Sequence, residues 1–229
     1  MKISVSIIIP TLNEVNSLKP TLEALKNFGK NTEIIVVDGG SEDDTAAIAE
    51  SYEVRVLHSN RGRGAQLDAG AKLANGNILW FLHADTIAPE NAIEQIKNAL
   101  NDKKIVGGNF TICFDGEGFW AKFLTRLYPQ LRKIGLCYGD SAFFVRRETY
   151  EKIGGFKPLP LFEDLDFFKR LKSAGNVINL PEKVVTSSRR FENRSFILTF
   201  ARWTIFQILY WLGVSPHTLG RFYMPIRKK

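Results

Sequence analysis

Short apolar runs alternate with helical patterns along the first hundred residues. The apolar runs are rich in β-branched and aromatic residues, and they predict strands at 3–9, 33–37, 54–57 and 77–82. Apolar residues at helical spacing predict helices through Leu18–Phe28, from Ser41, over 65–74, and from Pro89 to about Leu100. Asp44 follows Ser41 by three residues, in the arrangement of a capping box. Continuous apolar strands separated by helices predict an α/β fold with a parallel sheet covered on both faces.

The second half of the chain is less regular. Strands are expected at 104–114, 138–145 and within 177–186, an amphipathic basic segment at 119–134, and helices at 164–174 and 196–212. Neither an internal repeat nor a linker interrupts the pattern. We therefore expect one domain over 1–229, with a regular half at 1–100 and a less regular half at 101–229 that ends in the C-terminal helix.

Composition narrows the class of protein and its partners. Hydrophobic residues make up 45% of the chain and the formal net charge is +7, which suits a globular protein with an anionic partner such as a nucleotide, a membrane surface or nucleic acid. Cys113 and Cys137 lie far apart in the sequence and belong to no zinc-binding motif, so we expect two reduced thiols. The N-terminus is too short an apolar run for a signal peptide, and Arg202 interrupts the longest apolar segment. A cytoplasmic protein is expected.

Polar residues follow the predicted strands where each strand ends. Thr11 and Asn13 come after the first strand, Asp38 after the second and Asp85 after the fourth. The carboxyl ends of parallel strands meet at one edge of a sheet, where ligands bind in folds of this class. We expect these four side chains to share one ligand site.

Asp38 and Gly39 end the second strand as Val-Val-Asp-Gly-Gly-Ser. A carboxylate there can accept an N–H from the edge of a uracil or guanine, and the glycines let a ligand approach the backbone. A turn aspartate that caps the next helix would have the same sequence. The two interpretations have equal weight on this stretch alone.

The loop Arg61-Gly-Arg63-Gly-Ala-Gln66 is basic and glycine-rich and precedes a predicted helix. It suits a phosphate or diphosphate group. Its spacing matches neither a P-loop nor a dinucleotide-binding loop. A solvated basic turn is the alternative, and the loop by itself favours it.

His83-Ala84-Asp85 follows the most hydrophobic strand. A carboxylate held by a buried strand can bind Mg²⁺ or Mn²⁺, which takes its remaining ligands from phosphate and water. The alternative is a strand-end aspartate that caps the helix near Pro89. We favour the metal site.

Glu163 and Asp164 open a predicted helix and supply a candidate general base. The positive end of a helix dipole helps to keep such a carboxylate ionised. Acidic residues are common in first helical turns, and this alternative is favoured locally. Arg189 and Arg190 could stabilise a leaving diphosphate or form a surface pair, and Gly139-Asp140 could contact an acceptor or form a turn.

The segments 119–134 and 196–214 combine aromatic and aliphatic residues with Arg and Lys. They could lie on an anionic membrane surface and present a lipid-linked acceptor. Core helices whose basic side chains reach solvent have the same composition, and this is the default interpretation.

Taken together, the motifs resemble those of family 2 inverting glycosyltransferases over nearly the whole chain, with the closest likeness to the radical-SAM/selenodomain-associated branch. The matching stretches are SIIIPTLNE, EIIVVDGGSEDDT, GRGAQLDAGAKLANG, LWFLHADT, YGDSAFFVRR, IGGF and PLFEDLDFFKRLKSAG, followed by the SSRR pair. Two positions depart from the pattern: His83 replaces the first acid of the metal motif, and Asp68 replaces an amide.

The resemblance implies a GT-A fold and a UDP- or GDP-linked sugar donor, with a nucleotide-binding half at 1–100 and an acceptor-binding half at 101–229. It places the nucleotide against Pro10, Thr11, Asn13, Glu14, Asp38, Gly39, Arg63, Gln66 and Ala84. It implies Mg²⁺ or Mn²⁺ on Asp85 and Asp164 as the base of a single displacement. Gly139, Asp140, Glu163, Arg189 and Arg190 would face the acceptor or the diphosphate.

The resemblance also implies the partners. The acceptor would be a small molecule or lipid-linked, with a peripheral contact at the inner face of the membrane and no nucleic acid. Two other classes compete with the transferase. A nucleotidyltransferase should carry a glycine-rich G-x-G-x-R loop after the first strand, where this chain has Pro-Thr-Leu-Asn-Glu. A basic membrane- or nucleic-acid-binding module would explain the charge, but not the acids and glycines at strand ends.

Overall fold

The first four strands form the parallel part of one mixed sheet in the computed structural model, which describes residues 4–29, 31–189 and 195–223. These strands are β1 (Val5–Thr11), β2 (Thr32–Asp38), β3 (Arg55–His58) and β4 (Ile78–Phe81). The register pairs Thr11 with Asp38 and Asp38 with His58, so the carboxyl ends of β1, β2 and β3 are level. The predicted parallel sheet is confirmed for this half.

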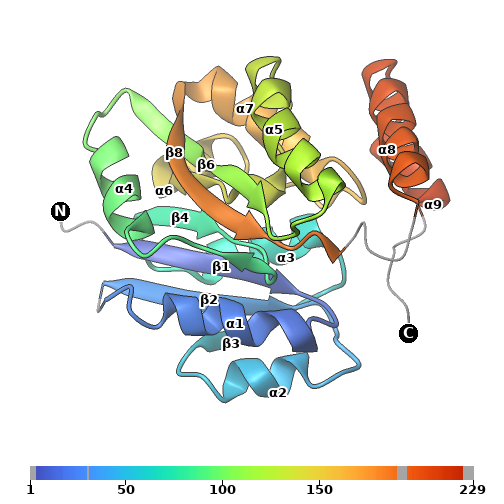
Figure 1. Cartoon of the computed structure of the whole chain (residues 1–229). Coiled ribbons are helices and arrows are strands. Elements are labelled where there is room, and N and C mark those ends of the chain that lie inside the picture. The colour runs from blue at the N-terminus through green and yellow to red at the C-terminus, as the bar shows by residue number, and fades with distance from the viewer. Residues whose placement is uncertain (1–3, 30, 190–194, 224–229) are drawn as a thin grey trace.

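The second half of the chain extends the same sheet, in the order β3-β2-β1-β4-β7-β6-β8-β5 (Figure 1). The added strands are β5 (Thr86–Ile87), β6 (Ile105–Phe114), β7 (Phe144–Arg146) and β8 (Asn176–Thr186). β7 is antiparallel to both β4 and β6, whereas β6 and β8 are parallel. β5 follows β4 closely along the chain. In the sheet, however, it pairs with β8 and runs antiparallel to it, at the end of the strand order.

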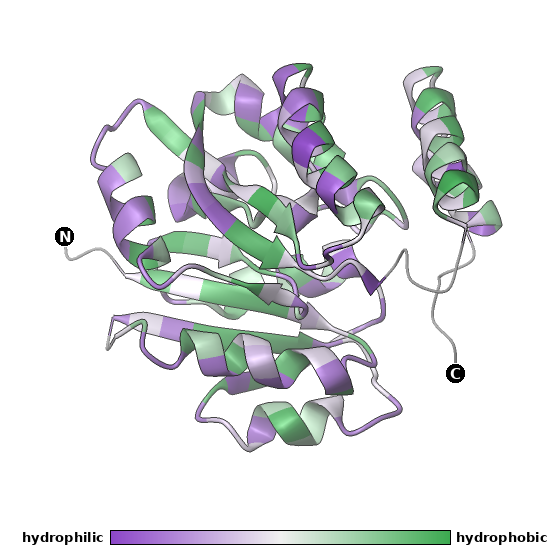
Figure 2. Ribbon diagram, in the orientation of Figure 1, coloured by the Kyte–Doolittle hydropathy of each residue, from purple (hydrophilic) through white to green (hydrophobic). Residues whose placement is uncertain are grey.

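Alternate side chains of the central strands pack into two separate cores, one on each face of the sheet. Ile7 and Trp80 point into the core that holds the buried residues of α1 (Val15–Leu25) and α4 (Ala92–Ala99). Ile8 points into the opposite core. This period of two is the geometry of a strand buried on both faces, and it explains why the runs are continuously apolar (Figure 2).

The remaining helices complete these layers. α5 (Phe119–Lys133) packs on β6, and α3 (Arg63–Leu73), α6 (Arg147–Lys152) and α7 (Glu163–Ala174) supply residues to the core of Ile8. α8 (Phe196–Trp211) and α9 (Pro216–Phe222) lie to one side (Figure 1). α8 contacts α5 where the rings of Trp120 and Phe196 stack at 4.0 Å.

The predicted helix start at Ser41 is wrong. α2 covers Thr45–Glu50, and the side chain of Asp43, not of Ser41, receives the backbone N–H of Thr45 at 3.0 Å. The Ser41 hydroxyl instead donates to Asp38 at 2.5 Å and accepts the N–H of Asn13. The loop between β2 and α2 is therefore tied to the end of β1.

Three elements were not predicted, and one strand is shorter than expected. β5, α6 and α9 are the additions. Of the expected strand at 138–145, the first part is a short 3₁₀ turn at Gly139–Ser141, and only β7 is extended. In the part of the chain that the structure describes, no helix has both the length and the apolarity needed to cross a bilayer.

Candidate active site

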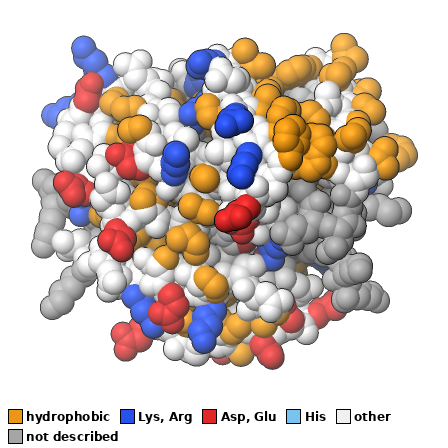
Figure 3. Space-filling model, in the orientation of Figure 1, with side chains coloured by type: hydrophobic (Ala, Val, Ile, Leu, Met, Phe, Trp, Pro, Cys, Tyr) orange, Lys and Arg blue, Asp and Glu red, His pale blue; other side chains and the backbone are white. Residues whose placement is uncertain are grey.

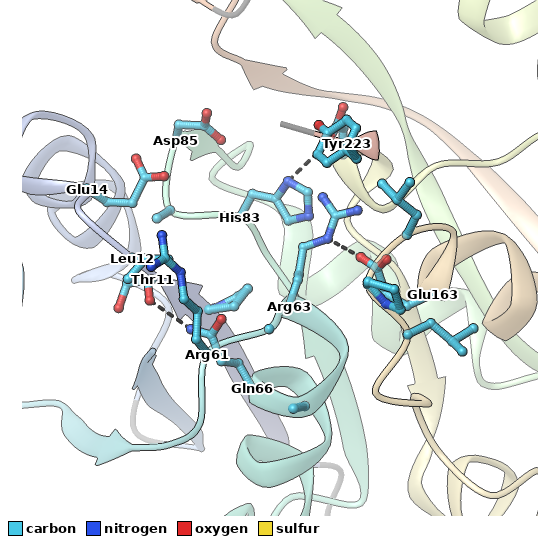
Figure 4. A pocket seen from close by; sticks show the side chains of 18 of the residues that line it. Thr11, Leu12, Glu14, Arg61, Arg63, Gln66, His83, Asp85, Glu163 and Tyr223 are labelled. Carbon is cyan, nitrogen blue, oxygen red and sulfur yellow. Dashed lines mark hydrogen bonds and ion pairs between the residues drawn. The ribbon is translucent and has the colours of Figure 1, made fainter. Parts of the chain in front are cut away.

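A cleft of about 840 Å³ opens at the carboxyl ends of β1 and β4 (Figure 4). Its walls contain most of the residues that the sequence pointed to: Pro10, Thr11, Asn13, Glu14, Arg63, Gln66, Ala84, Asp85, Asp140, Glu163 and Arg189. Four others, Asp38, Gly39, Gly139 and Asp164, are not among the residues that line it. Arg190 lies outside the described residues.

Asp38 is buried and turned toward its own loop. Its Oδ2 accepts the backbone N–H groups of Gly40 and Ser41, each at 3.0 Å, and its Oδ1 accepts the Ser41 hydroxyl. Burial opposes ionisation, but these hydrogen bonds outweigh it and lower the pKa of the Asp38 carboxyl. The turn interpretation of Asp38 therefore has direct support, and contact with a nucleotide base stays a prediction.

Gln66 links the ends of the first two strands. From α3, its Nε2 donates to the carbonyl oxygens of Thr11 at 2.7 Å and Val37 at 2.8 Å. A Cβ atom at Gly39 would lie 2.9 Å from Gln66 Cδ, so this contact requires glycine. Gln66 therefore shapes the cleft floor by holding β1 against β2.

The loop after β1 is fixed by the loop after β2. Asn13 adopts a positive φ of 54°, and its Oδ1 accepts the backbone N–H of Glu42 at 2.9 Å. The N–H of Glu14 donates to Thr45 Oγ1 at 2.7 Å. These contacts orient Glu14 toward the cleft, where Figure 4 shows it on the same side as Asp85.

Arg63 connects the basic loop to the Glu-Asp motif. Its Nε donates to the carboxylate of Glu163, and its Nη2 lies 3.5 Å from Asp164 Oδ2. Burial would lower the pKa of Arg63, but Glu163, Asp164 and Asp140 together raise it, so the guanidinium stays charged. The predicted nucleotide residue Arg63 thus also neutralises the acids at the start of α7.

Asp164 is buried at the N-terminus of α7. Its Oδ2 accepts the N–H of Gly139 at 2.9 Å. Burial and the neighbouring Glu163 raise the pKa of Asp164, and Arg63 and the Gly139 amide only partly oppose this. The helix end therefore does not by itself keep the pKa of Asp164 low, because burial beside a second carboxylate outweighs it.

His83 and Asp140 form a second polar pair on the cleft wall. His83 Nδ1 lies 3.0 Å from Asp140 Oδ1, and a Cβ atom at Gly139 would lie 3.2 Å from His83 Nε2. The absence of a side chain at Gly139 therefore lets the histidine and the short turn come together. The pair connects the residues after β4 to the turn before β7.

Asp85 is paired with Arg189 at the mouth of the cleft. Arg189 Nη2 lies 3.1 Å from Asp85 Oδ2 and also contacts the carboxylate of Glu14. Its Nη1 donates to Ser17 Oγ at 2.6 Å. The segment after β8 thus brings a cation to the predicted metal residue, and contact of Arg189 with a diphosphate stays a prediction.

The carboxylate ligands that the cleft offers fit a divalent ion that takes its other ligands from a diphosphate. Among the described residues no three His, Cys, Asp or Glu side chains converge tightly enough to hold a metal alone. Mg²⁺ and Mn²⁺ sites of nucleotide enzymes commonly use one or two protein carboxylates and complete the shell with phosphate and water oxygens. Asp85 on the cleft wall supplies such a carboxylate.

Several cleft residues were missed by sequence reasoning. Tyr128 of α5, Trp203 of α8 and Tyr223 beyond α9 bring aromatic rings to the wall, and His217 of α9 also lines it. Their helical spacing is that of ordinary core residues, so no local signal marks them. Asp68 has a structural contact, because it accepts the hydroxyl hydrogen of Tyr150 at 3.0 Å.

The sequence matches the model of the family described as Glycosyl transferase family 2 over residues 6–154. The chain belongs to this family. Among curated members, it is 31% identical over 210 residues to an uncharacterized glycosyltransferase of Rickettsia bellii, covering 82% of this chain and 30% of that protein. It is 27% identical to glycosyltransferase AglE of Haloferax volcanii, covering 79% and 65%. The chain spans about a third of the length of the Rickettsia relatives.

Solved structures place this family 2 chain in the GT-A fold. It superposes with a TM-score of 0.68 on S. aureus TarS 1–349 in complex with UDP-GlcNAc, at 20% identity, covering 82% of this chain and 59% of TarS. The mannosyltransferase PcManGT of Pyrobaculum calidifontis, in complex with GDP-Man and Mn²⁺, gives 0.66 at 20% identity and covers 86% and 59%. The predicted fold and family are confirmed, whereas the radical-SAM-associated branch stays a prediction.

Proposed function

We propose that this chain transfers a sugar from a nucleotide-diphosphate sugar to an acceptor hydroxyl, with inversion at the anomeric carbon. One observation supports the proposal: Asp85 after β4 and Glu163 at the start of α7 line a single cleft, and Asp164, the second acid of the Glu-Asp motif, is buried next to Glu163. Family 2 membership and relatives whose structures contain UDP-GlcNAc, or GDP-Man with Mn²⁺, support a nucleotide-sugar donor.

The donor would bind with its diphosphate toward Asp85. Mg²⁺ or Mn²⁺, when bound there, would neutralise the charge that develops on the departing diphosphate. Arg61 and Arg189 line the same cleft and would add hydrogen bonds to phosphate oxygens, because a guanidinium matches phosphate geometry. The loop after β1, which is held by Gln66 and Asn13, would provide a fixed wall for the nucleoside.

The acceptor would enter from the side of α7 and the aromatic residues. Asp164 accepts the acceptor proton as the new C–O bond forms and the bond from the anomeric carbon to the diphosphate breaks. Asp164 is buried and its Oδ2 lies 3.5 Å from Arg63 Nη2, so an acceptor hydroxyl would reach the carboxylate once the Arg63–Glu163 pair moves. A raised pKa makes Asp164 a stronger base wherever it is ionised.

Ligand-induced thermal stabilisation tests the donor site. A nucleoside diphosphate at about 100 times its Kd should add about 2.7 kcal/mol, which corresponds to an increase in Tm of roughly 5–10 °C for a domain of this size. We expect one of UDP and GDP to stabilise the protein with Mn²⁺ and less without it, and Asp85→Asn to remove the Mn²⁺ dependence. Equal Tm values for all nucleotides with and without Mn²⁺ would contradict the proposal. Hydrolysis of a panel of nucleotide sugars then identifies the sugar.

A further inference from the structure

One face of α8 exposes a continuous stripe of large apolar side chains. Ile197, Leu198, Ile205, Ile208, Trp211 and Leu212 are 46–76% exposed. Leu198, Ile205, Ile208 and Leu212 are separated by seven, three and four residues, the spacings of one helical face. A different side of α8 carries Phe196, which is buried against Trp120, and Gln207, which is buried. The stripe is therefore not the side by which α8 joins the domain.

The beginning of α5 continues this apolar surface. Phe119 is 72% exposed, and Phe123 lies beside both Phe196 and Phe200 of α8. We call the exposed side chains Phe119, Phe123, Ile197, Leu198, Ile205, Ile208, Trp211 and Leu212 the α5–α8 face. Figure 3 shows hydrophobic side chains gathered over α8 and the adjoining part of α5. Soluble monomers seldom expose so large an apolar patch without a binding role.

The helices that form the α5–α8 face carry cations and no acids, and the nearest acids before α5 in the sequence are Asp115 and Glu117. Residues 118–139 and 195–229 contain no Asp or Glu. Lys122, Arg126 and Lys133 of α5 and Arg221 of α9 are exposed, and basic side chains stand beside the apolar patch in Figure 3. An exposed apolar helix flanked mainly by cations, with aromatic residues at its ends, is the pattern of a helix that lies in the interface of an anionic bilayer.

We propose that the α5–α8 face binds the surface of an anionic lipid bilayer, with α8 lying in the plane of the interface. A second copy of the chain fits less well, because a two-fold contact would bring the same cations together without acids to balance them. Anionic headgroups supply the missing countercharge. Trp203 of α8 and Tyr128 of α5 line the cleft, so the face and the cleft share two helices.

Vesicle co-sedimentation of the purified chain tests this proposal without any activity measurement. Vesicles of phosphatidylcholine alone are compared with vesicles in which about a third of the lipid is phosphatidylglycerol, because the anionic fraction sets the surface charge. We expect binding to the anionic vesicles, with little binding to neutral ones. The variant Lys122→Glu/Arg126→Glu should bind at least about tenfold more weakly, since it removes two cations and adds two acids.

Two further variants test the apolar side chains of the face and, as a control, charged residues elsewhere on the protein. Leu198→Ser/Ile205→Ser/Leu212→Ser removes exposed apolar groups and should also weaken binding by at least about tenfold. Lys103→Glu/Lys152→Glu makes the same charge change at exposed lysines on other elements and should bind like the wild type. Each variant is checked for an unchanged Tm.

Three results would overturn the proposal. They are no sedimentation of the wild type with anionic vesicles, equal loss of binding in the control variant, or a dimer by light scattering that the Leu198→Ser/Ile205→Ser/Leu212→Ser variant abolishes. A failure of the donor-binding experiment would leave these results unaffected, because vesicle binding does not depend on the nucleotide site.

Discussion

Arg189 Nη2 lies 3.1 Å from Asp85 Oδ2, and the same guanidinium contacts the carboxylate of Glu14. Burial lowers the pKa of Arg189, but the two carboxylates raise it by more, so the guanidinium stays charged. A cation from the segment after β8 thus balances the acids at the mouth of the cleft. In the proposed reaction this cation and the metal would share one carboxylate.

Removal of Arg189 should strengthen metal binding in the absence of nucleotide. Arg189→Ala takes a positive charge from beside Asp85, so we expect Mn²⁺ alone to bind several-fold more tightly, as measured by calorimetry or by the Mn²⁺ electron paramagnetic resonance signal. Arg189→Lys keeps the charge and should stay near the wild type. Weaker Mn²⁺ binding in Arg189→Ala would contradict the view that Arg189 and the metal compete for the carboxylate of Asp85.

The pH dependence of turnover should report the environment of Asp164. Its pKa is raised by burial and by Glu163, so the protonated, inactive form persists above the ordinary aspartate pKa of about 3.9. Nucleoside diphosphate release from the donor should therefore fall as the pH is lowered, with a midpoint above that value. Glu163→Gln removes a neighbouring negative charge and should move the midpoint to lower pH. A midpoint that Glu163→Gln leaves unchanged would exclude Asp164 as the titrating group.

Asp38 should stabilise the fold in a pH-dependent way. Its folded pKa is lowered, so its contribution is present above the unfolded pKa of about 3.9 and is lost as the pH falls through the folded value. Asp38→Asn should lower the free energy of unfolding at pH 7 by about 1.5–3 kcal/mol, the range for hydrogen bonds to a charged group. Urea unfolding should show a smaller difference near pH 3. A difference that is equal at both pH values would contradict this role.

Gly64 should be required for the position of the Glu-Asp motif. A Cβ atom there would lie 2.2 Å from the carbonyl oxygen of Lys157 and 3.3 Å from Glu163 Cβ. Gly64→Ala should displace the 157–163 segment, destabilise the protein by about 1–3 kcal/mol and reduce turnover. Gly118→Ala is the matched control, because a Cβ atom there meets nothing within 4 Å and its φ is −65°. Equal Tm and turnover in the two variants would contradict the packing argument.

The sequence was most informative where local pattern and tertiary structure agree. The alternation of apolar runs and helices predicted β1 to β4 and the shared edge of Thr11, Asn13 and Asp85, because strand burial and strand direction follow from that pattern. The order of β7, β6, β8 and β5 was not readable. Those pairings join residues far apart in the chain, and β5 has only two residues.

Side-chain contacts were less predictable than positions. Arg63, expected at the nucleotide, also reaches Glu163 a hundred residues later, and no local spacing encodes such a pair. Asp38 lies where expected, but its hydrogen bonds turn it toward Gly40 and Ser41. The aromatic residues Tyr128 and Trp203 join the cleft only through the packing of α5 and α8.

The most direct test of the central claim is donor binding and turnover in Asp164→Asn. The variant keeps the size of the side chain and removes the base, so calorimetry should give a nucleotide affinity close to that of the wild type, with Tm maintained. The rate of sugar transfer, or of donor hydrolysis where water is the acceptor, should fall by about 10²-fold or more, as expected for loss of a general base. A transfer rate near that of the wild type, with binding intact, would contradict the assignment of Asp164.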